Sequence, residues 1–188
     1  MSSTALDDRT ALVLIDLQRG VLRLPVVHDV DGVLGNARRL VDAFRRAVLP
    51  IAFVRVNDLR PTRTDQAPPP IISSRDFDEF TEAVHPEPAD IIVTKHGWDA
   101  LYATDLDLQL RRRRISGIVL AGISASRGVE STARSAHVRG YNLTFASDAI
   151  SDIDRASFDH SLQTIFPRIG EVDVTGTILR HVARRSGG

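Results

Sequence analysis

The chain has 188 residues, of which 43% are hydrophobic and 26% charged, and its 24 basic side chains balance 24 acidic ones. This composition is typical of an ordinary globular protein, so we predict a single domain over residues 1–188. The chain has no cysteine, which excludes disulfides, thiolate metal sites and a cysteine nucleophile. Its zero formal charge argues against nucleic acid as a partner.

The sequence contains no segment that could cross a membrane. Residues 1–10 are polar and acidic, and the longest aliphatic run, 11–15, is far shorter than the roughly 20 residues that a transmembrane helix needs. We therefore expect a cytoplasmic protein with no membrane partner.

Short runs of β-branched residues alternate along the chain with segments of helical periodicity. This alternation is typical of an α/β fold with a largely parallel sheet. We expect strands at 11–17, 51–56, 91–94, 118–123, 143–146 and 171–174. We expect helices at 32–48, 104–114, 128–139, 155–165 and 175–185. The proline-rich segment 57–70 is predicted to be a long surface loop.

Two of these helices have boundaries that their terminal residues suggest. Thr104 is the expected N-cap of the helix 104–114, and four arginines in its last turn, 111–114, suit the negative end of the helix macrodipole. We interpret this arginine run as a solvated helix end, with phosphate binding as the alternative. Pro167 is expected to stop the helix 155–165.

Polar groups follow three of the predicted strands, at the edge where parallel sheets place their active sites. Asp16 directly follows Ala-Leu-Val-Leu-Ile, and Lys95 follows Ile-Ile-Val-Thr. The strand 118–123 runs into Gly122-Ile-Ser-Ala-Ser-Arg-Gly128, a tight turn whose backbone N–H groups could bind an anion. The three strand ends thus offer an acid, a cation and a set of hydrogen-bond donors.

Lys95 is the single lysine among 24 basic residues, which favours a specific role over general surface charge. Lysine is a compact cation whose pKa changes on burial, whereas arginine is a permanently charged planar fork. Asp16 has two interpretations, a catalytic acid or a carboxylate that caps a turn. Asp148, after the strand 143–146, is interpreted as a cap or a structural hydrogen-bond acceptor.

No metal or cofactor is expected. The six histidines are scattered, and none shows the His-Glu-x-x-His or Asp-x-His spacing of a metal site. No Gly-x-Gly-x-x-Gly or Walker loop follows any predicted strand, which argues against nucleotide binding there.

Several segments resemble the isochorismatase-like hydrolases. The matching segments are ALVLIDLQ (11–18), IVTKHGW (92–98) with TDLDLQL (104–110), and VLAGIS (119–124) with GVESTAR (128–134) and Gly140-Tyr141. That family includes nicotinamidases, carbamoylsarcosine and other amidohydrolases, and true isochorismatases. The resemblance spans nearly the whole chain. It implies a three-layer α/β/α fold with a six-stranded parallel sheet, assembled into homodimers or larger homo-oligomers.

In the amidases of this family an Asp, a Lys and a Cys form the catalytic triad. The resemblance places the first two at Asp16 and Lys95, and the third falls on Gly128. Because glycine carries no nucleophile, the acyl-enzyme route is closed at that position. The metal-binding Asp-x-His of nicotinamidases is also absent, since this chain reads Arg-Val-Asn-Asp-Leu at 55–59.

True isochorismatases resemble the chain better, because vinyl-ether hydrolysis needs no covalent intermediate and some of them carry glycine at the third position. The resemblance then implies that Asp16 is a general acid with a raised pKa, acting with Lys95 on a small, anionic molecule. It also implies that the Gly128 N–H faces the substrate. The substrate-binding residues expected are Gln18, Trp98, Ser124, Ala125 and Arg127.

Two other interpretations remain open. Ser124 or Ser126 could act as a nucleophile, although no histidine is placed by motif to activate either one. The chain could instead be a catalytically inactive family member that uses the same pocket for binding or assembly.

Overall fold

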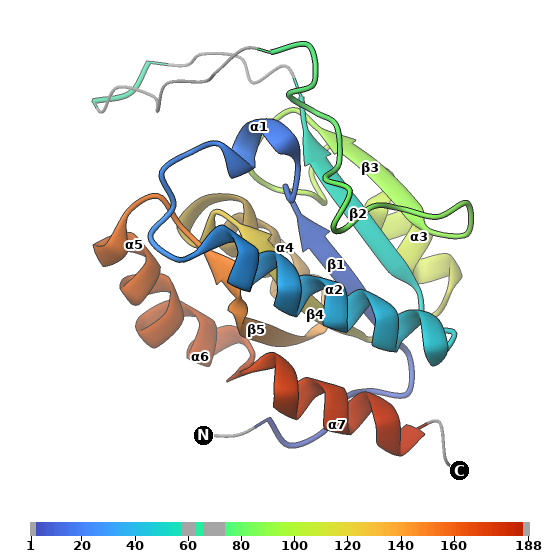
Figure 1. Cartoon of the computed structure of the whole chain (residues 1–188). Coiled ribbons are helices and arrows are strands. Elements are labelled where there is room, and N and C mark those ends of the chain that lie inside the picture. Colours follow the sequence, from blue (N-terminus) through green and yellow to red (C-terminus); the bar gives the residue numbers. More distant parts are fainter. Residues whose placement is uncertain (1–2, 58–62, 66–73, 186–188) are drawn as a thin grey trace.

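The structure is a computed structural model, and it describes residues 3–57, 63–65 and 74–185. Six strands form one parallel sheet in the order β3-β2-β1-β4-β5-β6 (Figure 1). The strands are β1 (Thr10–Ile15), β2 (Ile51–Val56), β3 (Ile91–Lys95), β4 (Gly117–Ile123), β5 (Asn142–Ser151) and β6 (Glu171–Asp173). The expected α/β fold with a six-stranded parallel sheet is confirmed. The single-domain organisation of 1–188 stays a prediction.

Helices cover both faces of the sheet (Figure 1). They are α1 (Arg19–Leu22), α2 (Val30–Arg46), α3 (Leu106–Arg112), α4 (Glu130–Val138), α5 (Arg155–His160), α6 (Phe166–Ile169) and α7 (Thr175–Arg185). Two π-helical segments, η1 (Ala125–Val129) and η2 (Ser161–Ile165), lead into α4 and α6. No helix among the described residues is both long enough and apolar enough to cross a membrane.

The alternation of side chains along β1 divides the core into two layers. Val13 and Ile15 pack with buried residues of α3, η1, α4 and α6 on one face of the sheet. Leu12 and Leu14 pack with buried residues of α2 and α7 on the other face. Every residue of β1 is therefore buried, as expected for a central strand of a parallel sheet.

The topology places a crevice next to β1. Successive strands are added on one side of β1 as β2 and β3, and on the other side as β4, β5 and β6. The strand order thus reverses between β1 and β4, and ligands of such sheets bind outside the carboxyl ends of the strands at this reversal.

The structure corrects several predicted boundaries. The helix α3 begins after Asp105, one residue later than predicted. Thr104 Oγ1 still accepts a hydrogen bond from the backbone N of Leu106 (3.3 Å), and it donates one to the Ala100 carbonyl (2.5 Å). Pro167 does not stop the helical region, because it lies in the first turn of α6, directly after the π-helical segment η2, where its fixed φ suits a helix. The short helix α1 was not predicted. Most of the predicted loop 57–70 lies outside the described residues.

The strand β5 is longer than the predicted 143–146, because a bulge interrupts its pairing with β4. Leu120 pairs with Phe145, but Gly122 pairs with Ile150. Asp148 lies in this bulge rather than at the strand end, and its Oδ1 accepts hydrogen bonds from the backbone N and Oγ1 of Thr175 (both 2.7 Å). The predicted structural role of Asp148 is confirmed, since it holds the start of α7.

Candidate active site

Asp16 and Lys95 meet in a buried ion pair beyond the carboxyl ends of the strands. Nζ of Lys95 lies 2.7 Å from Oδ2 of Asp16, and the two side chains are 2% and 8% exposed. Lys95 ends β3 and Asp16 follows β1, so the strand β2 lies between them. The lysine side chain, with its four methylenes, spans that distance.

The backbone at Asp16 turns sharply to aim its side chain into the site. Its φ of 54° lies in the left-handed region, which aspartate tolerates better than most residues. Its backbone N–H donates to the Val54 carbonyl (2.9 Å), which ties the turn to β2. Non-glycine residues held in this region are enriched at functional sites.

The two oxygens of the Asp16 carboxyl group have different environments. Oδ2 accepts the hydrogen bond from Lys95, whose Nζ also donates to the Gly97 carbonyl (3.0 Å). Oδ1 is buried and has no hydrogen-bond partner among the described residues. Burial raises the pKa of Asp16 to about 6, although the charge and hydrogen bond of Lys95 act in the opposite direction. The proton of the neutral acid therefore belongs on Oδ1, where it is free to be donated.

Gly128 faces this pair. A Cβ atom added to Gly128 would lie 3.1 Å from Oδ2 of Asp16, 3.7 Å from Nζ of Lys95 and 2.9 Å from Cγ2 of Ile15. The three residues predicted to be catalytic thus lie together, and the space next to Gly128 is too tight for a side chain unless Ile15 shifts.

Gly122 allows β4 to approach the end of β1. Its φ is 130°, and a Cβ at this position would lie 2.0 Å from the Ile15 carbonyl oxygen. Any other residue would push the turn that follows β4 away from Asp16.

The turn between β4 and α4 is held by a carboxylate that the sequence analysis missed. The backbone N and Oγ of Ser126 both donate to Oδ2 of Asp152 (2.7 Å each), and the backbone N of Ile153 donates to Oδ1 (2.7 Å). Asp152 is 1% exposed. The only signal in the sequence was the Asp-Ile-Asp at 152–154. Because β5 extends to Ser151, Asp152 directly follows a strand, as Asp16 does.

Neither Ser124 nor Ser126 has a histidine partner among the described residues. Oγ of Ser126 donates to Asp152, and Oγ of Ser124 is buried with no hydrogen-bond partner among the described residues. A histidine does contact a serine nearby, since Nδ1 of His28 lies 2.9 Å from Oγ of Ser151. However, Nε2 of His28 lies 3.3 Å from Nη1 of Arg155, which can only donate. Nδ1 must then carry the proton, so His28 cannot deprotonate Ser151.

The remaining predicted substrate-binding residues lie in different environments. Ala125 is buried in η1. Trp98 is 54% exposed, and the guanidinium carbon of Arg127 lies 5.9 Å from its ring centre. Gln18 is fully buried, and its side chain bonds the backbone N and O of Val56 (2.8 and 3.0 Å) and the carbonyl of Phe77 (2.9 Å).

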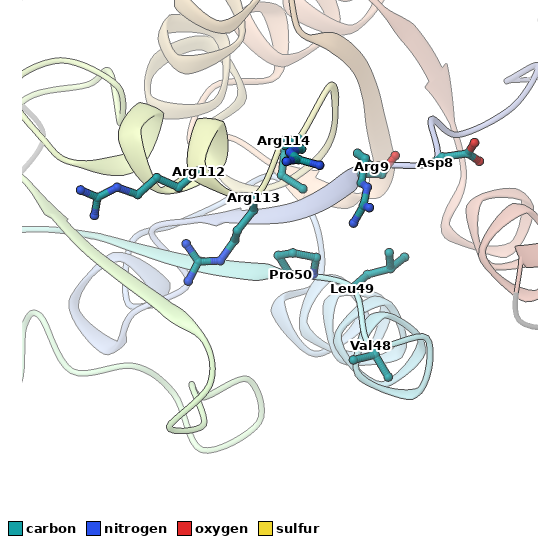
Figure 2. A pocket seen from close by; sticks show the side chains of 10 residues that line it. Asp8, Arg9, Val48, Leu49, Pro50, Arg112, Arg113 and Arg114 are labelled. Carbon is teal, nitrogen blue, oxygen red and sulfur yellow. The ribbon is translucent and has the colours of Figure 1, made fainter.

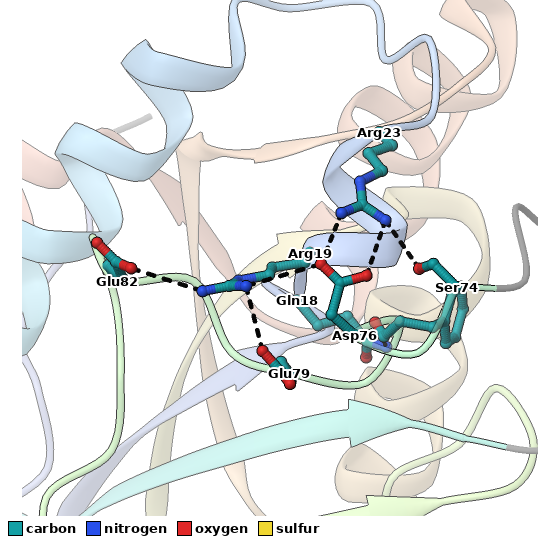
Figure 3. Close-up of polar contacts among 8 residues, drawn as sticks. Gln18, Arg19, Arg23, Ser74, Asp76, Glu79 and Glu82 are labelled. Atoms are coloured by element: carbon teal, nitrogen blue, oxygen red, sulfur yellow. Dashed lines mark hydrogen bonds and ion pairs between the residues drawn. The ribbon is translucent and has the colours of Figure 1, made fainter.

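Ion pairs and close packing hold the segment 74–82 against α1 (Figure 3). Arg19 forms ion pairs with Glu79 and Glu82, and both Arg19 and Arg23 pair with Asp76. The pKa of Asp76 is held well below its usual range by the hydrogen bond from Arg23. The ring of Phe77 packs so closely on Gly20 that a Cβ there would lie 2.0 Å from the ring. The segment 74–82 therefore fixes the chain that immediately follows Asp16.

The described part of the chain holds no group of three or more His, Cys, Asp or Glu residues that could bind a metal ion.

Comparison with known proteins identifies the family. The Isochorismatase domain matches residues 10–175. The isochorismatase family protein YwoC of Bacillus subtilis is 41% identical over 182 residues, which cover 93% of this chain and 94% of that protein. The structure of an isochorismatase family protein from Burkholderia thailandensis matches with a TM-score of 0.91 and 38% identity, covering 97% of this chain and 100% of that one. A cysteine hydrolase from Pseudomonas syringae matches with a TM-score of 0.80 and 26% identity, covering 98% and 100%.

Proposed function

The chain belongs to the isochorismatase family, and from this we propose that it is a hydrolase that acts on a small, anionic metabolite without a cysteine nucleophile. The observation that carries the proposal is the asymmetric carboxyl group of Asp16. Lys95 holds Oδ2, while the buried Oδ1 has no partner among the described residues. A carboxyl group with a pKa of about 6 and one free oxygen suits a general acid at neutral pH.

We propose a vinyl ether of the isochorismate type as the substrate. In this reaction Asp16 donates the proton from Oδ1 to the terminal carbon of the enol ether, and the π electrons form the new C–H bond. The resulting oxocarbenium ion takes up water, the water returns a proton to Asp16, and the hemiketal then breaks its C–O bond to release pyruvate and an alcohol. Lys95 stabilises the carboxylate that forms between the two proton transfers.

Other residues would then bind and position the substrate. Arg127 carries a permanent charge beside Trp98, which suits a substrate carboxylate at the rim of the site. The N–H of Gly128 and Oγ of Ser124 would bind polar atoms of the substrate or of the attacking water, with Ala125 closing the apolar wall. Gln18, whose polar atoms bond the backbone, would position the chain that follows Asp16.

Incubation of the purified protein with isochorismate tests this proposal. We expect pyruvate to be released, and we expect Asp16→Asn to abolish its release. The matched control is Asp31→Asn, which changes an exposed carboxylate of α2 and should keep wild-type activity. Absence of pyruvate with the wild type would exclude this substrate.

A protein that binds without turnover is the second candidate, and Gly128 is the observation that favours it. Amidase activity gained by Gly128→Cys, together with no activity of the wild type on vinyl ethers, would support this candidate. The cysteine would place its Cβ 3.1 Å from Oδ2 of Asp16, next to the base that a thiol needs.

We also propose that the chain forms a homodimer or a larger homo-oligomer. Large apolar side chains support this, because Ile92 of the edge strand β3 is 53% exposed, and Tyr102 and Leu108 are 75% and 50% exposed. Light scattering coupled to size-exclusion chromatography measures the assembly directly. The cytoplasmic location stays a prediction.

A further inference from the structure

A groove with basic walls lies at the amino-terminal edge of the sheet (Figure 2). Asp16 and Lys95 lie at the opposite end of the strands. The volume of the groove is about 470 Å³, and its lining comes from the start of β1, the connection between α2 and β2, and the end of α3. We call it the basic groove because four of its lining residues are arginines, Arg9 and 112–114. A cavity of this size suits a small molecule rather than a single inorganic ion.

The arginines of the basic groove lack carboxylate partners. Arg9, Arg112 and Arg114 form no ion pair or side-chain hydrogen bond with any residue in the described ranges, and Arg113 bonds only the neutral oxygens of Gln109. Asp8 is the one acidic residue of the described lining, and it already has a partner. The chain as a whole has no net charge. The unpaired arginines therefore make this edge of the sheet a local positive patch.

The backbone holds these arginines in place. The N–H groups of Arg113 and Ile115 donate to the Leu110 carbonyl, and the Arg9 carbonyl accepts from Ser116 and Gly117. These bonds join the start of β1 to the turn after α3, and Ile115 anchors that turn in the core. In Figure 2 the side chains of Arg9 and Arg113 extend downward, toward the side of the groove that holds Leu49 and Pro50. The side chain of Arg112 extends to the left, away from that side.

An apolar surface faces the arginines across the groove. It consists of Val48, Leu49 and Pro50. Val48 is 89% exposed and has a φ of 53°, a conformation that is rare for a β-branched residue. The groove therefore combines several guanidinium groups with an exposed aliphatic residue whose backbone has an unfavourable conformation.

We propose that the basic groove binds a phosphorylated small molecule. Arg9, Arg113 and Arg114 bind the phosphate oxygens, and the surface formed by Val48, Leu49 and Pro50 packs against the organic part of the ligand. The guanidinium groups come from two segments, one before β1 and one after α3, so they can bind a multiply charged phosphate from different sides. A ligand with a single carboxylate would not need so many guanidinium groups. The neutral overall charge argues against a nucleic acid, which needs a long basic track.

Calorimetric titration of the full chain with ADP, inorganic pyrophosphate and adenosine tests the proposal. We expect ADP and pyrophosphate to bind at one saturable site, and we expect adenosine not to bind. Arg9→Gln combined with Arg114→Gln should weaken ADP binding by about tenfold for each arginine removed. The matched control, Arg38→Gln with Arg168→Gln, removes two exposed arginines of α2 and α6 and should leave the affinity unchanged.

A second measurement needs no variant. Phenylglyoxal modifies accessible arginines, and ADP should protect Arg9 and Arg114 but not Arg38, as read by peptide mass spectrometry. Failure of both ADP and pyrophosphate to saturate would overturn the proposal, and so would equal weakening in the control variant. Binding of duplex DNA more tightly than ADP would assign the groove to nucleic acid and overturn it as well. The outcome does not depend on the proposed hydrolysis, because the two sites lie at opposite edges of the sheet.

Discussion

Lys95 reaches past β2 to place its ammonium group 2.7 Å from the carboxylate of Asp16, and both groups are almost completely buried. Taking two charges out of water is costly unless each satisfies the other. One oxygen of Asp16 has no partner among the described residues, so a single hydrogen bond joins the pair, and Lys95 donates one further hydrogen bond, to the Gly97 carbonyl. This arrangement favours a role in chemistry over a role in stability, and it leads to the first two predictions.

The activity on a vinyl ether should fall as the pH rises through about 6. A general acid must carry its proton, and the pKa of Asp16 is raised to about 6 by burial. Above that pH the protonated fraction falls, so kcat/KM should drop about tenfold for each further pH unit. The rate measured between pH 5 and pH 8 checks this. A rate that increases over that range would indicate that Asp16 acts as a base.

Lys95→Met should destabilise the protein more at pH 8 than at pH 5. Without the lysine the pKa of Asp16 rises further, because both effects that lower it are lost. At pH 8 the unfolded chain keeps this carboxyl group ionised, whereas the folded variant must either protonate it or bury it charged without a partner, and either costs about 3 kcal/mol. At pH 5 it is protonated and the cost is smaller. Urea unfolding at the two pH values measures the difference, and adding Asp16→Asn to the variant should remove it.

Gly128→Ala should reduce both activity and stability. The added Cβ would lie 2.9 Å from Cγ2 of Ile15 and 3.1 Å from Oδ2 of Asp16, so the packing around the ion pair must shift, at about 1–2 kcal/mol. Gly35→Ala is the control, because this exposed position in α2 has no atom within 4 Å of the new Cβ. It should gain about 0.5–1 kcal/mol by helix propensity and keep full activity. Thermal unfolding and the pyruvate assay compare the two, and equal behaviour would contradict the placement of Gly128.

Val48→Gly should stabilise the protein by about 1 kcal/mol. Val48 follows α2 with a φ of 53° and is 89% exposed, so glycine relieves the backbone without losing buried surface. Val138→Gly serves as the contrast, because Val138 is similarly exposed at 84% but is the last residue of α4 and has no left-handed backbone to relieve. That change should cost about 0.5 kcal/mol. Chemical denaturation should show that the free energy of unfolding rises in the first variant and falls in the second.

Gln18→Met should lower the free energy of unfolding by about 2–3 kcal/mol. The change leaves the backbone N–H of Val56 and the carbonyls of Val56 and Phe77 without their buried partner. Arg23→Gln removes an exposed ion pair from the same segment and should cost far less. Comparable losses in the two variants would show that the segment 74–82 is held by its surface charges instead.

The sequence indicated that Asp16 and Lys95 lie at the same edge of the sheet, for a physical reason. Asp16 and Lys95 each follow a run of aliphatic residues, and parallel strands bring such ends to one edge. The turn that ends at Gly128 was also indicated, but the position of Gly128 beside the pair came only through the family resemblance.

The parts that the sequence did not predict depend on contacts between distant segments. Gln18 bonds residues 38 and 59 positions away, and nothing near it in the chain indicates those partners. Asp152 accepts hydrogen bonds from Ser126 because a bulge lengthens β5 and brings Asp152 next to that turn. The register of a strand is set by its neighbours rather than by its own residues, so the sequence did not indicate this contact. The short helix α1 was missed because its four residues give no measurable period.

The burial of Lys95 makes this residue a natural reporter of local opening. It is the chain's single lysine, so a reagent that acylates amines meets one side-chain target, which peptide mapping separates from the α-amino group, and that target is 1% exposed. Acylation of Lys95 must wait until the region around Asp16 opens, and the labelling rate therefore measures how often it does so. A ligand that seals the site should slow the labelling, which offers a screen for substrates that requires no assay of turnover.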